Sequence, residues 1–179
     1  LNPLNLGNSG TSIRLMTGLL SAQIFDSTLC GDESLSKRPM ARIIDPLSEM
    51  GALIKSSDSM PPLSISGNQK LSALKYTLPV ASAQIKSCLL LAGLYADGKT
   101  CITENATTRD HTERMLKGFG YKVTSSSGQV SLTGGGQLQG CDIKVPSDIS
   151  SAAFFIVAAS IANNADITLE AVNINPTRT

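Results

Sequence analysis

A repeated order of elements limits the folds open to this chain more than any other feature of its sequence. Three stretches each run from a turn of small residues through an apolar helix to a β-rich strand: residues 10–30, 82–105 and 147–173. The spacing from Thr11 to Ser82 and the spacing from Gly51 to Gly120 differ by only two residues. Two nearly equal spacings, taken at different points of the pattern, indicate a duplicated unit.

Each unit is expected to read βαβαββ. The periodicity predicts helices at Thr11–Ser21, Ser82–Tyr95 and Ile149–Ala162, followed by strands at Ile24–Cys30, Thr100–Thr103 and Asp166–Leu169. In the first two units a second helix ends at an apolar residue and a glycine, and two more strands follow: Ala52–Ser56 with Leu63–Ser66, and Tyr121–Ser125 with Val130–Thr133. The strand that leads into the first helix is Leu4–Leu6.

Proline and glycine mark the ends of these elements. Pro39 lies near the first turn of a second helix, where its missing N–H costs little. The expected left-handed C-terminal caps of the helices are Gly51, Gly118 and Gly120. The expected turns are Pro61-Pro62 and Ser125–Gly128.

The pattern therefore predicts an α/β (α+β) chain that forms a single partial domain, residues 1–179, built from units of about 1–70, 71–140 and 141–179. The third unit stops before its second helix, and the strand at Leu4–Leu6 has no earlier partner. Because the first residue is Leu1 and not Met, we expect the chain to be a piece of a longer protein.

Composition excludes several classes of partner. Fifteen Lys and Arg residues against fourteen Asp and Glu residues leave a net charge of +1, so no strong field attracts nucleic acid or an anionic membrane. The longest apolar stretches, 88–96 and 152–162, are far shorter than the roughly 20 residues of a membrane helix. The absence of Trp also argues against stacking single-stranded nucleic acid. An anionic ligand must therefore be held by local geometry.

Cysteine usage favours a reducing compartment. The four cysteines are widely spaced, with no pair at the CxxC spacing of a metal site, and His111 is the only histidine. We therefore expect no metal site. In a chain of this size such cysteines fit small core positions, which indicates the cytoplasm.

The segment Leu6–Ser12 is the first candidate site, because it joins a strand to a helix and carries Gly7 and Gly10. Glycines let the backbone approach a ligand, and the first N–H groups of a helix bind anions such as phosphate or carboxylate. The alternative is a plain tight turn in which Thr11 or Ser12 caps the helix. The spacing fits neither a Walker motif nor GxGxxG, so it does not indicate nucleotide binding.

A pair of cations, Lys37 and Arg38, is the second candidate. They stand before the helix start at Pro39, where cations oppose the helix dipole, so a structural role is less natural than anion binding. The alternative is a solvated surface pair with Asp32 or Glu33.

The start of the first helix in the second unit is the third candidate. Ser82 and Gln84 lie there, at the place that Gly10 and Thr11 take in the first unit. Two helix starts that bind anions could therefore converge if the units pack around a pseudo-axis. Asp148, at the third helix start, would repel an anion and is expected to be a plain N-cap.

Residues 107–114 precede the second helix of the second unit, and Arg109 matches the region of Arg38 in the repeat. His111 is a candidate acid or base; the alternative is that it simply caps the helix or forms a hydrogen bond beside Asp110 and Glu113. The sequence shows no Ser/His/Asp set and no pair of inward carboxylates, so it does not supply an evident catalytic machinery.

Five segments together resemble the N-terminal half of the 5-enolpyruvylshikimate-3-phosphate synthase (3-phosphoshikimate 1-carboxyvinyltransferase) family. They are Leu6–Leu15, Gly31–Leu35 with Lys37–Met40, Val80–Ser87, Arg109–Leu116 and Asn175–Thr179. They span essentially the whole chain in the order of the family's motifs. Several independent motifs in order are more specific than any one of them.

The resemblance implies the enolpyruvyl transferase fold, in which two domains of βαβαββ units hold ligands in the cleft between them. The chain would be most of one domain, and its partners would be the two substrates and the missing second domain. The implied reaction transfers the enolpyruvyl group from phosphoenolpyruvate to the 5-hydroxyl of shikimate 3-phosphate, a shikimate-pathway step toward chorismate and the aromatic amino acids. It uses no metal and no organic cofactor.

The resemblance also assigns residues. Phosphoenolpyruvate would contact Gly10, Arg38 and Gln84, and shikimate 3-phosphate would contact Ser82, Ala83, Gln84 and Arg109. Thr11 and Arg14 would support the loop and helix around Gly10. Glycine rather than alanine at position 10 implies sensitivity to glyphosate.

The family's catalytic groups would lie outside this chain, so we expect no catalytic residue in it and no turnover by the isolated chain. Two alternatives stay open: the related UDP-N-acetylglucosamine enolpyruvyl transferase, and a folded module without a ligand of its own. Residues 31–40 and the Ser82-Ala83-Gln84 set favour shikimate 3-phosphate over the UDP-sugar.

Overall fold

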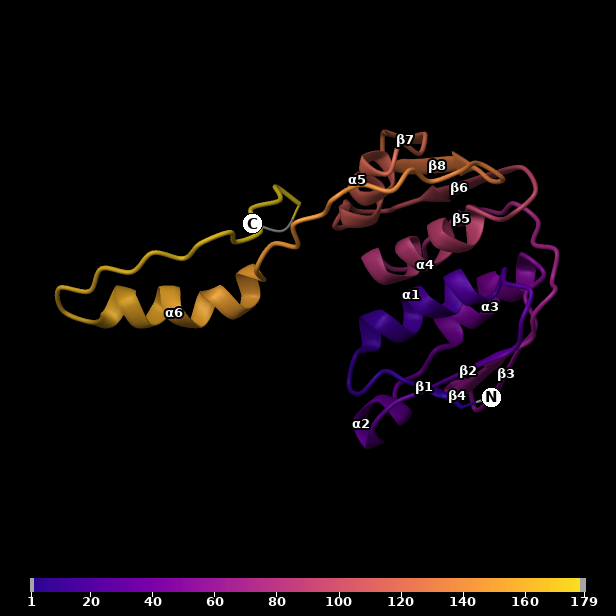
Figure 1. The fold of residues 1–179 in the computed structure, drawn as a ribbon, viewed down its shortest axis with the longest axis horizontal. Coiled ribbons are helices and arrows are strands. Elements are labelled where there is room, and N and C mark those ends of the chain that lie inside the picture. Colours follow the sequence, from indigo (N-terminus) through magenta and orange to yellow (C-terminus); the bar gives the residue numbers. More distant parts are fainter. Residues whose placement is uncertain (1, 178–179) are drawn as a thin grey trace. The chain divides into compact units, whose positions relative to one another are not determined.

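The computed structural model describes residues 2–177. Leu1 and the end of the Asn175–Thr179 motif, Arg178 and Thr179, lie outside the described residues. The chain divides into two compact units, residues 1–139 and 140–179, drawn in Figure 1. Within residues 2–177 no helix is both long and apolar enough to cross a membrane. The larger unit carries all but one of the candidate helix starts.

The larger unit contains two four-stranded sheets of the same design. The first has the order β1-β2-β4-β3: β1 (Leu4–Asn5), β2 (Ser27–Cys30), β4 (Met60–Ile65) and β3 (Ile54–Ser57). The second has the order β5-β6-β8-β7: β5 (Lys75–Thr77), β6 (Lys99–Thr103), β8 (Gln129–Thr133) and β7 (Val123–Ser126). In both sheets the first two strands are parallel and the other neighbours antiparallel. The predicted α/β class and the duplication are confirmed.

Helices fill the space between these sheets (Figure 1). The inner helices are α1 (Gly10–Leu20), α3 (Ala41–Glu49) and α4 (Ala83–Gly93), and the remaining helices of this unit are α2 (Glu33–Ser36) and α5 (His111–Gly118). Helices α1 and α4 pack closely. At Gly18 the approach is so close that an added Cβ would lie only 2.2 Å from the carbonyl oxygen of Cys88. Helix α4 is buried almost all round, which explains its continuous apolar run.

The two β-hairpins turn through residues with positive φ. Asp58 and Ser59 join β3 to β4, and Ser127 and Gly128 join β7 to β8. Positive φ at both central residues is the type I′ geometry, which matches the twist of the strands. The turn predicted at Ser125–Gly128 is confirmed. The turn predicted at Pro61-Pro62 is wrong, because both prolines lie inside β4, joined by a cis peptide bond.

Two of the three expected glycine caps are confirmed. Gly51 (φ 102°) follows α3 and Gly120 (φ 76°) follows α5, both in the left-handed region that ends a helix. Gly118 is instead the last residue of α5 and has a helical backbone, so its assignment as a cap is wrong.

The smaller unit contains α6 (Ile149–Ile161), capped by Asp148, which accepts a hydrogen bond from the backbone N–H of Ser150 at 3.2 Å. The expected N-cap role of Asp148 is confirmed. The strand predicted at Asp166–Leu169 is wrong: these residues form no strand, and the only parallel pairing described in this unit is a bridge between Ser147 and Val172. The arrangement of residues 1–179 as one domain of three units stays a prediction.

Candidate functional site: a cationic helix start beside a small cavity

The start of α1 is capped one residue earlier than its sequence predicts. Ser9 is the N-cap, and its Oγ accepts from the backbone N–H of Ser12 at 3.1 Å. The expectation that Thr11 or Ser12 caps the helix is therefore wrong. Because Ser9 takes this role, the hydroxyl of Thr11 is available to accept a hydrogen bond from Nε2 of Gln84 at 2.8 Å.

Two guanidinium groups meet at Gly10, the first residue of α1. Arg14 donates from Nη1 to the carbonyl oxygen of Gly10 at 3.1 Å. Arg38 reaches the same place from the segment after α2, and it donates to the side-chain oxygen of Asn8 and to Oγ of Ser34. A Cβ on Gly10 would lie 2.9 Å from Nη1 of Arg38 and 3.0 Å from Nη1 of Arg14. Both guanidinium groups thus occupy the space beside Gly10 that a side chain would need.

These cations lack compensating charge. Neither Arg14 nor Arg38 belongs to an ion pair within residues 2–177. Burial lowers the pKa of Arg14, and the positive charges of Arg38 and Arg42 lower it further. An anion placed between Arg14 and Arg38 would relieve this repulsion and would lie at a helix start, where the helix dipole favours negative charge.

The alternative of a solvated surface pair applies to Lys37 and not to Arg38. Lys37 forms an exposed ion pair with Glu33 at 2.6 Å. The carboxylate of Asp32 caps α2 by accepting from the backbone N–H of Leu35 at 2.8 Å. Both acidic residues are therefore engaged, which leaves Arg38 as the cation of this segment that faces Gly10.

The starts of α1 and α4 converge, as the repeat predicts. Oε1 of Gln84 accepts from Nη1 of Arg14 at 2.9 Å while its amide nitrogen donates to Thr11. Beside them lies a cavity of about 110 Å³. Its lining residues are Thr11, Leu15, Ala83, Gln84, Ser87, Arg109, His111 and Thr112.

The cavity brings together most of the residues assigned to shikimate 3-phosphate. Ala83, Gln84 and Arg109 line it. Ser82 does not line it, and its Oγ caps α4 by accepting from the backbone N–H of Ile85 at 3.4 Å, so its expected N-cap role is confirmed. His111 lies at the first position of α5 and lines the cavity. No group of three His, Cys, Asp or Glu residues within residues 2–177 is placed to hold a metal ion.

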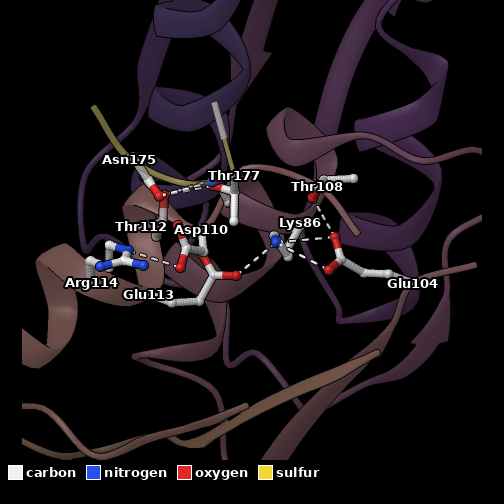
Figure 2. Close-up of polar contacts among 10 residues, drawn as sticks. Lys86, Glu104, Thr108, Asp110, Thr112, Glu113, Arg114, Asn175 and Thr177 are labelled. Carbon is white, nitrogen blue, oxygen red and sulfur yellow. Dashed lines mark hydrogen bonds and ion pairs between the residues drawn. The ribbon is translucent and has the colours of Figure 1, made fainter. Parts of the chain in front are cut away.

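Sequence reasoning missed a buried ion cluster beside this cavity. Lys86 of α4 lies between the carboxylates of Glu104 and Glu113 (Figure 2). The signal was present as a lysine inside a largely apolar helix, because a buried lysine requires acidic partners. The partners could not be chosen from the sequence, since each lies on a different element.

The fold and the site now define the class. Two mixed four-stranded sheets with helices between them, and a helix start that carries two arginines, form an α/β domain of the enolpyruvyl transferase kind. Residues 2–179 match the model of the family described as EPSP synthase (3-phosphoshikimate 1-carboxyvinyltransferase). The chain belongs to this family, and the resemblance drawn from its motifs is confirmed.

Individual relatives agree with the family. The chain is 67% identical over 179 residues to the 3-phosphoshikimate 1-carboxyvinyltransferase of Vesicomyosocius okutanii, covering all of this chain and 41% of that protein. It is 64% identical over 178 residues to the enzyme of the same name from Alkalilimnicola ehrlichii, covering 99% of this chain and 40% of that protein. The solved EPSP synthase of Acinetobacter baumannii matches with a TM-score of 0.89 and 59% identity, over 99% of this chain and 40% of that one. The chain thus spans about two-fifths of the length of these relatives.

Proposed function

We propose that the protein transfers the enolpyruvyl group of phosphoenolpyruvate to the 5-hydroxyl of shikimate 3-phosphate, and that this chain supplies part of the substrate-binding cleft. In this reaction the hydroxyl oxygen loses its proton and bonds to C2 of phosphoenolpyruvate while C3 gains a proton. The tetrahedral intermediate then expels phosphate and loses a proton from C3, which restores the double bond. The observation that carries the proposal is the meeting of Arg14 and Arg38 at Gly10 without compensating charge. Family membership supports phosphoenolpyruvate as the anion.

The helix start at Gly10 suits phosphoenolpyruvate, which carries both a phosphate and a carboxylate. The planar fork of Arg38 can bind either group with two parallel hydrogen bonds. The same charge would stabilise the phosphate as it leaves, because donors fixed before the reaction act most strongly where charge develops. Arg14 and Thr11 hold Gln84 at the edge of this subsite. A bound substrate would replace one of these hydrogen bonds and would then be bound by the side-chain amide of Gln84.

The cavity beside α4 suits shikimate 3-phosphate. Ser82 and Ala83 bring the first backbone N–H groups of α4, and Arg109 adds a cation at the cavity wall. Gln84 lies between this cavity and Arg14, so it can contact both substrates. Acid–base catalysis is assigned to the rest of the enzyme, with no catalytic residue, metal or organic cofactor in this chain. The cytoplasm is the proposed compartment, consistent with the free cysteines of the described part.

A hybrid enzyme tests the proposal. The chain replaces the matching residues of the Vesicomyosocius okutanii relative, and steady-state kinetics are measured with both substrates. The hybrid should be active. Arg38→Ala should raise the KM for phosphoenolpyruvate and Arg109→Ala the KM for shikimate 3-phosphate, each by roughly tenfold to a hundredfold, because a charge-assisted hydrogen bond contributes about 1.5 to 3 kcal/mol.

Controls separate this function from its competitors. Arg114→Ala removes an exposed arginine of α5 that pairs with Asp110 and should change neither KM. An inactive hybrid, beside an active parent relative, would refute the proposal. Selective use of UDP-N-acetylglucosamine would assign the chain to the related transferase. Silent Arg38→Ala and Arg109→Ala variants would leave a folded module with no ligand of its own.

A further inference from the structure

The buried ion cluster is not explained by the residues assigned to substrate binding. Lys86 is 1% exposed, and its Nζ lies 3.0 Å from Oε1 of Glu104 and 2.7 Å from Oε1 of Glu113 (Figure 2). The two carboxylate side chains are 6% and 3% exposed. Glu104 follows β6 directly and Glu113 lies in the first turn of α5. One lysine of α4 therefore binds both ends of the segment that joins these elements.

A second buried contact lies one residue further along α4. Oγ1 of Thr112 donates to Oγ of Ser87 at 2.7 Å, and both side chains are buried. Consecutive residues of α4 thus hold consecutive residues at the start of α5. Within the connecting segment, Oγ1 of Thr108 donates to a carboxylate oxygen of Glu104 (Figure 2). The segment is therefore anchored on both sides of Arg109.

The energetics favour a geometric role for the cluster. Burying ionised groups is costly, and apolar side chains of similar volume are often equally stable or more stable in their place. The charges do not balance, because one lysine faces two glutamates, and Oε2 of Glu113 has no hydrogen-bond partner among the described residues. Directional contacts, unlike apolar packing, fix the register of one element against another.

We propose that Lys86, Glu104 and Glu113 form a positioning cluster, which holds residues 104–112 against α4 so that Arg109 faces Gln84 across the cavity. This inference rests on the proposed function, in which Arg109 binds shikimate 3-phosphate. The cluster itself lines neither the cavity nor the start of α1. It should therefore set the affinity for shikimate 3-phosphate and leave the affinity for phosphoenolpyruvate, held at Gly10 and Arg38, nearly unchanged.

The test is an apolar triple variant of the hybrid enzyme: Lys86→Met, Glu104→Leu and Glu113→Leu. The KM for shikimate 3-phosphate should rise by roughly tenfold or more, because misplacing a binding group by about 1 Å can cost as much as about a hundredfold. The KM for phosphoenolpyruvate should stay within about twofold, and the melting temperature should not fall. An unchanged KM for shikimate 3-phosphate in the folded triple variant would overturn the proposal.

Single changes at Glu113 make a similar comparison at one position of the cluster. Glu113→Gln keeps the size of the side chain and an acceptor for Nζ of Lys86, so the KM for shikimate 3-phosphate should remain close to the parental value. Glu113→Ala removes the contact and should raise it. Equal KM values for these two variants would contradict a positioning role. Arg114→Ala, which breaks an exposed ion pair on the same helix, is the matched control.

Hydrogen exchange separates this inference from the proposed function. Amide protons of residues 104–112 should exchange faster in the triple variant, while those of α1 should not change. This readout does not require activity. An inactive parental hybrid would refute the proposed function, whereas unchanged exchange at residues 104–112 would refute the positioning cluster.

Discussion

Replacing Gly10 by alanine tests whether the two guanidinium groups at the start of α1 hold an anion. The new Cβ would lie 2.9 Å from Nη1 of Arg38 and 3.0 Å from Nη1 of Arg14, against 3.4–4 Å for ordinary contact. Each group must therefore move away by roughly half an ångström to reach its normal contact distance. Both are ends of flexible side chains, so the fold can accommodate the change.

The expected loss falls on binding and not on stability. Alanine forms helices better than glycine by up to about 1 kcal/mol, so the free energy of unfolding should stay the same or rise. Displacing Arg38 weakens a charge-assisted bond worth about 1.5 to 3 kcal/mol, and losing about 1 kcal/mol of it raises the KM for phosphoenolpyruvate roughly fivefold. The sensitivity to glyphosate that Gly10 implies should also decrease.

The assay measures KM for phosphoenolpyruvate, inhibition by glyphosate and the melting temperature of the hybrid enzyme. Gly118→Ala is the control, because the Cβ that it would add has no atom within 4 Å beyond its chain neighbours and the backbone of its own helix. If Gly10→Ala leaves both the KM and the inhibition unchanged, the guanidinium groups do not form the subsite. If it instead lowers the melting temperature by several degrees, the glycine serves packing.

Two further predictions concern the packing of α1 against α4. Gly18→Ala should lower the free energy of unfolding by about 1 to 3 kcal/mol. The reason is that its Cβ would lie 2.2 Å from the backbone oxygen of Cys88, which cannot move without the rest of α4. The measurement is urea unfolding, and a free energy equal to that of Gly118→Ala would contradict the prediction. Burial raises the pKa of the Cys88 thiol from 9.0 to about 12, so the folded state keeps a proton that the unfolded chain releases. The stabilisation from this group is complete below about pH 9 and declines toward pH 12, by at most about 1.4 kcal/mol per pH unit. The difference in free energy of unfolding between the parent and Cys88→Ala should therefore shrink from pH 9 to pH 12. A difference that stays constant would refute the pKa shift.

Much of the fold could be predicted because its signals are local. The βαβαββ order follows from hydrophobic periodicity, and the Gly51 and Gly120 caps follow from the left-handed backbone that glycine adopts most easily. The prediction of a turn at Pro61-Pro62 was wrong because both prolines lie within β4. The residues that form the turn are the preceding Asp58 and Ser59. Local composition indicates that a turn lies nearby, but it does not decide which residues form the turn.

The strand expected at Asp166–Leu169 failed for a different reason. A strand exists only where a neighbour completes its hydrogen bonds, and within residues 140–177 the structure shows one bridge, between Ser147 and Val172. β-propensity alone therefore could not decide this element.

By itself, the sequence determined the duplicated unit, the α/β class and the small-residue helix starts at Gly10 and Ser82, since each depends on residues close together in the chain. Only the tertiary structure decided that Gln84 bonds Thr11, 73 residues away, and that Lys86 is buried between two carboxylates. These contacts join elements that the packing of whole units brings together. Packing depends on the combined shape of many side chains, so no local pattern specifies its outcome.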